Sequence, residues 1–493
     1  MGSDNLQAKV INATKWSTIT EIATKIISPI TNMILARIIS PEAFGVVATV
    51  TMVFSFADML TEGGFQKYLI QKEFESSNDK FKNANVAFWS NLIISIILFG
   101  VIVIFRNDIA ELIGSPKLGN VIAIACIQLP ITSFSSVQMA LYRREFDFHT
   151  LFKVRIILAI VPLMITVPLG LIGFSYWSFI IAGITSQLMN SILLTRMSKW
   201  RPNLYFSINI LKKMLSFSSW SLVESVLLWI STWIDVFIIG NLLSQYQLGI
   251  YKTGTSMVNT LMTIIVGAIT PVLFSTLSRL QKDNIEFNKV YLVTQRNVAI
   301  FILPMGVGIY LYSNLVTNIM LGEMWNVASE TIGIWAITSA IMIVFSQFCT
   351  EVYRAKGRPK LSFLAQVLYI VVLCPICIIS AKKGFTYFLY SRAWIKLQFV
   401  LINLIIMKVI TKISFKMVIK NLAPIIISTS IMYLIDIVLQ VIGSGLLWDI
   451  ISIIICVIVY GSSLLLFGDI RKELFLILDK MNIKKWRIDL KRS

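Results

Sequence analysis

Apolar runs about as long as a bilayer is thick recur from one end of the chain to the other. A helix needs about 20 apolar residues to cross the ~30 Å hydrocarbon core of a membrane, so each run is a candidate span. Only 14% of the 493 residues are charged, against about 25% in soluble domains. This composition excludes a soluble enzyme and a disordered scaffold, and it predicts an all-α integral membrane protein. Fourteen spans are predicted, at residues 16–39, 44–65, 84–105, 118–140, 152–173, 175–196, 214–240, 247–275, 295–320, 328–351, 361–381, 385–409, 422–442 and 445–467.

The positions of the basic residues predict how the spans are oriented. When both termini and the even-numbered connections are placed inside, 35 of the 44 Lys and Arg residues lie on that side and four lie outside. Cytoplasmic loops of membrane proteins collect basic residues, so topology explains the net charge of +19 and nucleic-acid binding is not needed. We expect cytoplasmic N- and C-termini, and a basic amphipathic tail over residues 471–493 that lies on the inner leaflet.

Cysteine and histidine usage points away from a metal site or a cofactor. All five cysteines lie within apolar runs, and the pair Cys374 and Cys377 has no second pair nearby. His149 is the single histidine, which leaves too few ligands for a zinc site of the usual kind. We therefore read the cysteines as small apolar residues and expect no cofactor.

An internal repeat relates two stretches of the chain. At an offset of 204 residues, Trp16 matches Trp220 and Gly45 matches Gly249. The second stretch begins after six predicted spans, so both enter the membrane from the same side and should be related by an axis along its normal. The predicted architecture is two six-helix lobes followed by two extra helices, at residues 1–205, 206–410 and 411–470.

Polar and charged side chains lie on one face of several predicted spans. A charge at bilayer depth is costly unless it faces water or a partner, so we expect these faces to line a central water-filled cavity. Lysine and arginine bind phosphate groups well, and the candidates for binding a pyrophosphate headgroup are Lys25, Arg37, Lys252, Arg392 and Lys396. The candidates for contacts with sugar hydroxyls, for gating ion pairs or for a coupling ion (H+ or Na+) are Glu21, Asn32, Asp58, Glu62, Glu224, Asp235 and Asn259.

A purely structural interpretation stays open for each of these residues. Glu21 and Lys25 could form an ion pair within one helix, and Arg37, Asp58 and Glu62 could extend toward the membrane boundary. Charges in mid-span cannot reach the boundary in this way, so the set as a whole favours the cavity.

Several segments, taken in order along the chain, resemble a known family. They are residues 35–45 (LARIISPEAFG), 63–72 (GGFQKYLIQK), 270–281 (TPVLFSTLSRLQ) and 354–360 (RAKGRPK). Together they resemble polysaccharide transporters of the Wzx type, similar to teichuronic acid exporters. These belong to the multidrug/oligosaccharidyl-lipid/polysaccharide (MOP) exporter superfamily, together with the MATE drug exporters.

The resemblance implies a MATE-like fold and a flippase rather than an enzyme. Its substrate would be a polyprenyl-pyrophosphate-linked oligosaccharide, moved from the inner to the outer leaflet of the bacterial cytoplasmic membrane by alternating access. The product would serve synthesis of a surface polysaccharide such as O-antigen, capsule, exopolysaccharide or teichuronic acid. Implied partners are the lipid-linked oligosaccharide, membrane lipids and polysaccharide-assembly proteins.

Two other functions stay open. A cation-coupled multidrug exporter of the same fold would favour a more apolar or acidic cavity, which five bases within the spans argue against. A membrane glycan polymerase or ligase would be expected to carry a large outer loop with catalytic residues, whereas the predicted outer loops are all short.

Overall fold

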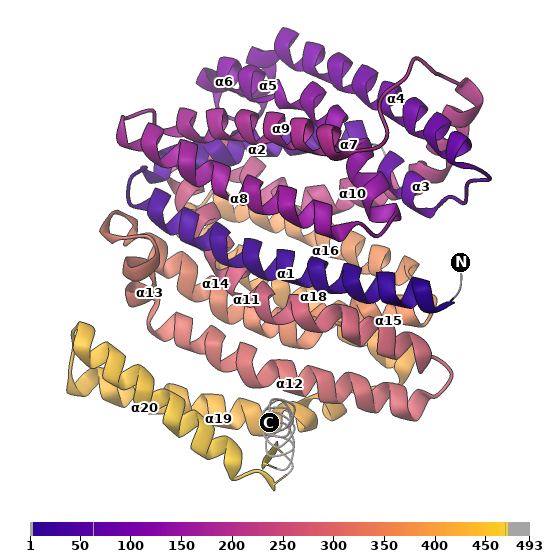
Figure 1. The fold of residues 1–493 in the computed structure, drawn as a ribbon. Helices are drawn as coiled ribbons and strands as arrows, with labels where there is room; N and C mark the ends of the chain where they lie inside the picture. Colours follow the sequence, from indigo (N-terminus) through magenta and orange to yellow (C-terminus); the bar gives the residue numbers. More distant parts are fainter. Residues whose placement is uncertain (1–2, 63, 469, 472–493) are drawn as a thin grey trace, which may run out of the picture. The chain divides into compact units, whose positions relative to one another are not determined.

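The computed structural model describes residues 3–62, 64–468 and 470–471, and every regular element in these ranges is a helix (Figure 1). The predicted all-α class is therefore confirmed. The predicted tail lies outside the described residues beyond Arg471. The chain divides into two compact units, which we call unit 1 (residues 1–260, 320–331 and 366–392) and unit 2 (residues 261–319, 332–365 and 393–493). The predicted lobes are a different partition and stay a prediction.

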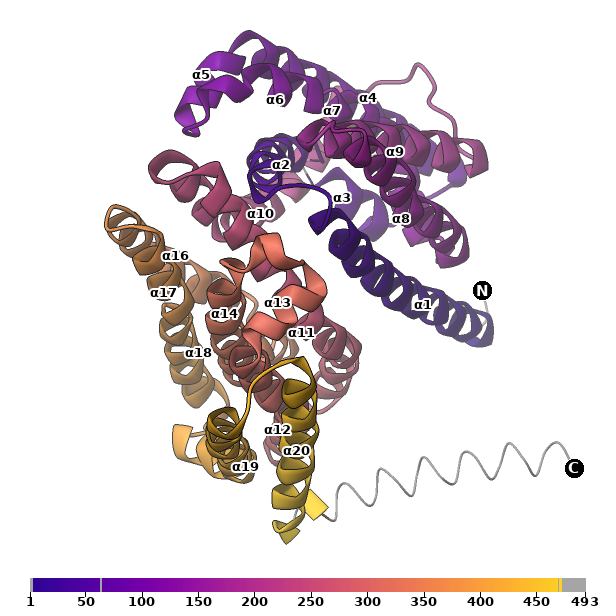
Figure 2. The same cartoon turned by 90° about the vertical axis from the view of Figure 1, so that its left-hand side faces the viewer.

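Unit 1 contains helices α1 to α10 and parts of several later helices. Its elements are α1 (Ser3–Ala36), α2 (Pro41–Glu62), α3 (Phe65–Gln71), α4 (Ser77–Ile104), α5 (Arg106–Leu112), η1 (Pro116–Leu118), α6 (Gly119–Ala125), α7 (Gln128–Arg144), α8 (Phe148–Leu171), α9 (Tyr176–Met197), α10 (Ile208–Leu242), the first part of α11 (Gln245–Arg279), η2 (Glu323–Trp325), most of α16 (Lys360–Ala381) and most of α17 (Phe385–Trp394). Within it, α1 runs along α8, and α2 packs against α10 (Figures 1 and 2).

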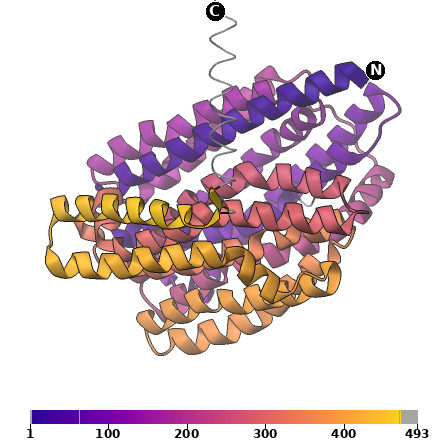
Figure 3. The same cartoon turned by 90° about the horizontal axis from the view of Figure 1, so that it is seen from below.

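Unit 2 contains the remaining helices. Its elements are the second part of α11, α12 (Asn284–Leu311), α13 (Ser313–Met320), most of α14 (Ala328–Met342), the π-helical turn η3 (Ile343–Gln347), α15 (Cys349–Ala355), α18 (Lys396–Thr411), α19 (Phe415–Ile442) and α20 (Leu446–Leu465). The gold and yellow helices α19 and α20 form an antiparallel pair, and α12 packs against α19 (Figure 3).

The described residues form twelve helices that are long and apolar enough to cross a membrane, or thirteen when the bent helix α11 is counted as one span. The chain is therefore a multi-pass membrane protein. Helix α1 is long enough but is not among these spans, because its polar and charged side chains lower its hydropathy. The count of fourteen spans stays a prediction.

Four predicted spans are divided between successive helices in the structure; one of them, at residues 328–351, passes through η3 between α14 and α15. The span predicted at residues 118–140 is split between α6 and α7, where Gln128 Nε2 donates to the freed Ala125 carbonyl at 3.0 Å. The span predicted at residues 295–320 ends at Leu311 and restarts as the short helix α13. The span predicted at residues 385–409 is interrupted at Ile395. Residues 118–140, 328–351 and 385–409 still lie within single candidate spans, so the breaks correct the continuity of the helix and not the prediction of a span; apolar runs do not reveal such breaks.

Proline explains the bend in α11. The helix bends by 40° between Gly267 and Ile269. Pro271 lies four residues after Gly267 and has no N–H to donate to the Gly267 carbonyl, and its ring crowds that carbonyl. The bend therefore falls at the turn where Pro271 removes one backbone hydrogen bond of the helix.

A buried apolar cluster of unit 1 surrounds the short helix α3. Phe65 and Leu69 of α3 are buried against Phe88 of α4, together with Trp200 from the segment after α9 and Met214 of α10. Helix association in lipid depends on close packing of this kind more than on exclusion of water. The cluster thus joins α3 and α4 to residues more than a hundred positions later in the sequence.

Candidate functional site

A buried ion pair joins α10 to α17 in unit 1. Arg392 Nη2 lies 3.5 Å from Asp235 Oδ2, and the two side chains are 8% and 6% exposed. Tyr251 Oη donates to the same carboxylate oxygen at 2.6 Å, and Arg392 Nη1 donates to Tyr369 Oη at 2.9 Å. A residue predicted to bind the headgroup and one predicted for sugar contacts, gating or ion coupling therefore neutralise each other in this structure. Headgroup binding by Arg392 would require the pair to separate, whereas an ion pair is compatible with gating by Asp235, and both roles stay predictions.

Lys252 is the residue after Tyr251 on α11. Its Nζ lies 4.2 Å from the ring centroid of Trp233 and 3.5 Å from the Thr232 carbonyl oxygen, and its side chain is half-buried. An ammonium group over an indole face is stabilised without being neutralised. Lys252 thus keeps a positive charge next to α10, as its predicted role requires.

Glu21 of α1 lies between two basic side chains. Its carboxylate oxygens are 3.7 Å from Lys25 Nζ and 3.7 Å from Arg155 Nη1 of α8, and all three side chains are partly exposed. The ion pair within α1 that the structural interpretation predicted is present. Because a second base from α8 joins it, the group keeps one net positive charge, and the headgroup role of Lys25 stays a prediction.

Asp58 and Glu62 lie one turn apart near the end of α2, and both are half-buried. Gln66 donates to the Glu62 carboxylate, and its Nε2 also lies 3.3 Å from Ser136 Oγ of α7. Arg143 Nη1 donates to Gln66 Oε1 at 3.4 Å. The two acids thus belong to a polar group between α2 and α7, where ion coupling remains their predicted role.

The remaining candidates are dispersed. Lys396 is buried in unit 2, where its Nζ donates to Ser339 Oγ at 2.8 Å and lies 3.2 Å from the Trp335 ring centroid. Arg37 was predicted within a span, but α1 ends at Ala36, so this exposed residue lies beyond the helix. The last three candidates lie on separate helices, Asn32 half-buried on α1, and Glu224 and Asn259 exposed on α10 and α11.

Two glycines matched by the internal repeat form the crossing of α2 and α11. A methyl group placed on Gly45 would lie 2.0 Å from the Gln245 carbonyl oxygen, and one placed on Gly249 would lie 1.8 Å from the Pro41 carbonyl oxygen. Pro41 and Gln245 are themselves 204 residues apart, so the contacts are reciprocal, as across a two-fold axis. Small residues permit this close approach of two membrane helices.

Further contacts close the same end of unit 1. Gln245 Nε2 donates to Ser115 Oγ at 2.7 Å, and Thr49 Oγ1 donates to Gln245 Oε1 at 3.3 Å. Trp325, which is fully buried, donates from Nε1 to the Ala36 carbonyl at 2.7 Å and thereby satisfies the last turn of α1. We call these contacts, together with the Gly45–Gly249 crossing, the closed end. The loops that carry it are those predicted to lie outside.

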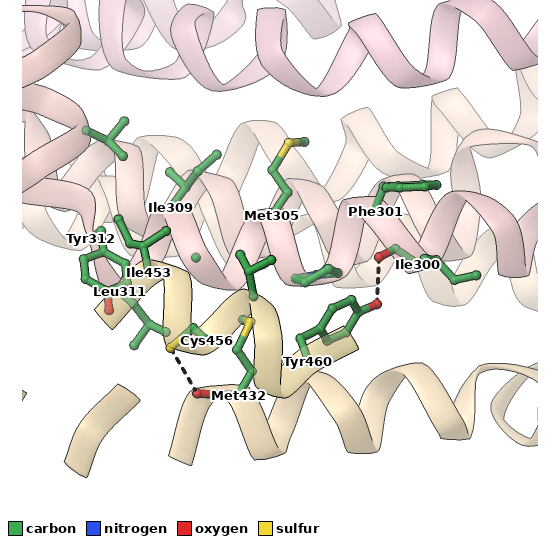
Figure 4. Close-up of a pocket in the computed structure, with 14 residues that line it drawn as sticks. Ile300, Phe301, Met305, Ile309, Leu311, Tyr312, Met432, Ile453, Cys456 and Tyr460 are labelled. Carbon is green, nitrogen blue, oxygen red and sulfur yellow. Dashed lines mark hydrogen bonds between the residues drawn. The ribbon is translucent and has the colours of Figure 1, made fainter. Parts of the chain in front are cut away.

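A separate apolar pocket lies in unit 2 between α12, α19 and α20. It has a volume of about 490 Å³ and is lined by residues such as Phe301, Met305 and Met432 (Figure 4). The hydroxyl of Tyr460 at its wall donates to the Ile300 carbonyl at 2.7 Å. With its polar atom engaged, the wall suits an apolar group rather than a sugar.

Sequence reasoning missed three features of these units. It did not single out Trp229 and Trp233, although their spacing of four residues places them on one face of α10. It found the Gly45–Gly249 match but did not predict their contact. It also missed Asp436, a buried acid of α19 that accepts from Tyr312 Oη and from Gln440 Nε2; a lone acid within an apolar run was the available signal.

Known proteins share both the sequence pattern and the fold. A family model described as Polysaccharide biosynthesis protein matches residues 34–330, more than half of the chain. The succinoglycan biosynthesis transport protein ExoT of Rhizobium meliloti (strain 1021) is 23% identical over 333 residues, covering 68% of this chain and 67% of that protein. The lipopolysaccharide biosynthesis protein WzxC of Escherichia coli (strain K12) is 21% identical over 386 residues, covering 77% of each chain.

A solved structure of the lipid II flippase MurJ, in an inward closed conformation, superposes with a TM-score of 0.73. It is 15% identical and covers 92% of this chain and 98% of its own. At this identity the likeness shows the fold alone. With a family model matched across α2 to α13, the chain belongs to the polysaccharide biosynthesis protein family.

Proposed function

We propose that this protein is a flippase for a polyprenyl-pyrophosphate-linked oligosaccharide. It moves the substrate from the inner to the outer leaflet of a bacterial cytoplasmic membrane, where the oligosaccharide enters a surface polysaccharide. A charged sugar headgroup cannot cross hydrocarbon unaided, whereas the polyprenyl tail can stay in lipid. The protein therefore has to shelter the headgroup and is a transporter rather than an enzyme.

The family match over residues 34–330 is the observation that carries this proposal. It includes α2, α10 and the first part of α11, the helices that hold Asp58, Asp235 and Lys252. The relatives ExoT and WzxC are named for transport and biosynthesis of polysaccharides, and the structural neighbour MurJ is named as a lipid II flippase. These names agree with a lipid-linked glycan as substrate.

The closed end supports alternating access as the mechanism. Backbone contacts between Gly45 and Gly249 leave no room for a headgroup at that end of unit 1. Release there would require α2 and α11 to move apart, and uptake would occur from the opposite end. By the distribution of basic residues, the closed end faces outward and both termini lie in the cytoplasm. We expect a gradient of H+ or Na+, or the membrane potential, to drive the cycle.

Reconstitution tests the proposal. Purified protein in liposomes should accelerate movement of undecaprenyl-pyrophosphate-linked oligosaccharide between leaflets, measured by access of an external glycosidase to the sugar. Protein-free liposomes give the background rate. Efflux of a cationic dye without glycan flipping would favour a drug exporter, and growth of glycan chains by the purified protein would favour a polymerase.

A further inference from the structure

Two tryptophans of α10 form a ladder on the side of the helix that meets α2 and α11. Trp229 and Trp233 are one helical turn apart, and both side chains are half-buried. The ring of Trp229 lies 4.8 Å from the ring of Phe56 on α2, tilted by 56°. The ring of Trp233 carries the Lys252 ammonium at 4.2 Å. The two indoles thus lie between two helices that were predicted to line the cavity.

The surroundings of this ladder are polar. Trp229 Nε1 donates to Ser55 Oγ of α2 at 3.0 Å, and Thr232, between the two indoles in sequence, is exposed. Thr51 of α2 and Asn259 of α11 are exposed as well. Lipid-facing surfaces of membrane helices are apolar, and polar side chains at bilayer depth face a water-filled space or a partner. Because the Lys252 charge beside Trp233 would be costly against lipid, we take the ladder to face a water-filled space.

Aromatic rings amid hydroxyl and amide groups suit a carbohydrate. One face of a pyranose ring presents C–H bonds, whose partly positive hydrogens are attracted to the negative face of an aromatic ring. The hydroxyls at the edge of the same sugar need hydrogen-bonding partners, which Ser, Thr and Asn supply. A pyrophosphate alone would use the lysine but would gain nothing from two indoles.

We propose that Trp229 and Trp233 form a stacking platform for the sugar rings of the transported oligosaccharide. The two rings recognise the glycan part of the substrate, while positive charge at Lys252 serves the anionic part. This inference rests on the proposed flippase function and adds to it the residues that distinguish a glycan-bearing lipid from its bare carrier.

The test compares two probes on the same protein in nanodiscs. One probe is undecaprenyl-pyrophosphate-linked oligosaccharide, and the other is undecaprenyl pyrophosphate without sugar. Trp229→Leu should weaken binding of the glycan-bearing probe by about tenfold, which corresponds to the upper range for one aromatic contact, and leave binding of the bare probe unchanged. Trp233→Leu, which also removes the ring beneath Lys252, should weaken binding of the glycan-bearing probe about tenfold more than binding of the bare probe. Trp229→Phe and Trp233→Phe keep a ring and should restore most of the affinity. Trp394→Leu, at an exposed tryptophan ending α17, is the control.

The two probes separate the possible outcomes. Equal losses for both probes, or no loss for either, would overturn the stacking platform, since both results assign the tryptophans a structural role or none. Selective loss of the glycan-bearing probe in the Leu variants, with rescue by Phe, supports it. Wild-type protein that binds neither probe would refute the proposed function, and the platform with it. Monodisperse elution of each variant in size-exclusion chromatography shows that it is folded.

Discussion

Adding one methyl group at the crossing of α2 and α11 should open the closed end. In Gly45→Ala the new Cβ would lie 2.0 Å from the Gln245 carbonyl oxygen, whereas ordinary van der Waals contact begins at 3.4 Å. The two backbones must separate by about 1.4 Å, and overpacking of this kind costs about 1–3 kcal/mol. A cost of about 2 kcal/mol borne by the closed state alone shifts the equilibrium toward the open state roughly 30-fold.

Cysteine labelling can measure this shift. Thr49 is 1% exposed in the closed end, so Thr49→Cys should react slowly with a membrane-impermeant maleimide added outside intact cells. Adding Gly45→Ala should raise the labelling rate by an order of magnitude or more and slow flipping, because the transporter returns to the closed state less often. The matched control is Gly100→Ala, where a methyl group on α4 meets no atom within 4 Å. Four of the five native cysteines are buried, which keeps the background low.

The reasoning would be refuted by a specific pattern. If Gly45→Ala is folded, flips at the wild-type rate and leaves Thr49→Cys as slow to label as Gly100→Ala does, then the crossing is not part of a gate. Faster labelling from the cytoplasmic side only would instead reverse the assigned orientation.

Three further predictions concern named contacts. Asp235→Asn should destabilise the protein by about 3–5 kcal/mol because it leaves the Arg392 charge buried without its counter-charge, whereas the double replacement of Asp235 and Arg392 by leucine should recover most of that loss in thermal unfolding in detergent. Lys25→Ala and Lys252→Ala should reduce flipping more than membrane insertion, measured by transport against the amount of protein in the membrane; normal export by both variants would show that neither binds the headgroup. Trp325→Phe removes the hydrogen bond to the Ala36 carbonyl, which is worth about 1 kcal/mol, and should moderately accelerate labelling of Thr49→Cys. An unchanged labelling rate would show that this bond has no part in closure.

Hydropathy predicted most helices because the length of an apolar run has to match the thickness of the membrane that it crosses. Even the two short breaks at residues 173–175 and 443–445 are present, between α8 and α9 and between α19 and α20. The breaks at Tyr312 and Ile395 were not predictable in this way. Neither residue is a glycine or proline, and the polar residues beside them (Ser313 and Asn314, and Arg392 and Lys396) lie within longer apolar runs, so hydropathy continues across them.

The site was harder to predict because periodicity gives the face of a helix but not the partner that it meets. Arg392 and Lys396 share a face only if the helix between them is continuous, and the break at Ile395 removes that condition. Arg392 then pairs with Asp235, and Lys396 bonds to Ser339. Asp235 and Arg392 are 157 residues apart, and no spacing rule connects residues at that distance.

The reciprocity of the glycine contacts gives the gate a stricter test. Gly45 approaches Gln245, and Gly249 approaches Pro41; the offset of 204 residues exchanges the two contacts. The predicted two-fold axis between the helices would make the two glycines equivalent in the closed state, so Gly249→Ala should raise the labelling rate of Thr49→Cys about as much as Gly45→Ala does. The double variant should add little, because one methyl group already separates the backbones and neighbouring changes are not additive. Unequal single effects that add in the double variant would show two independent local contacts and no shared axis.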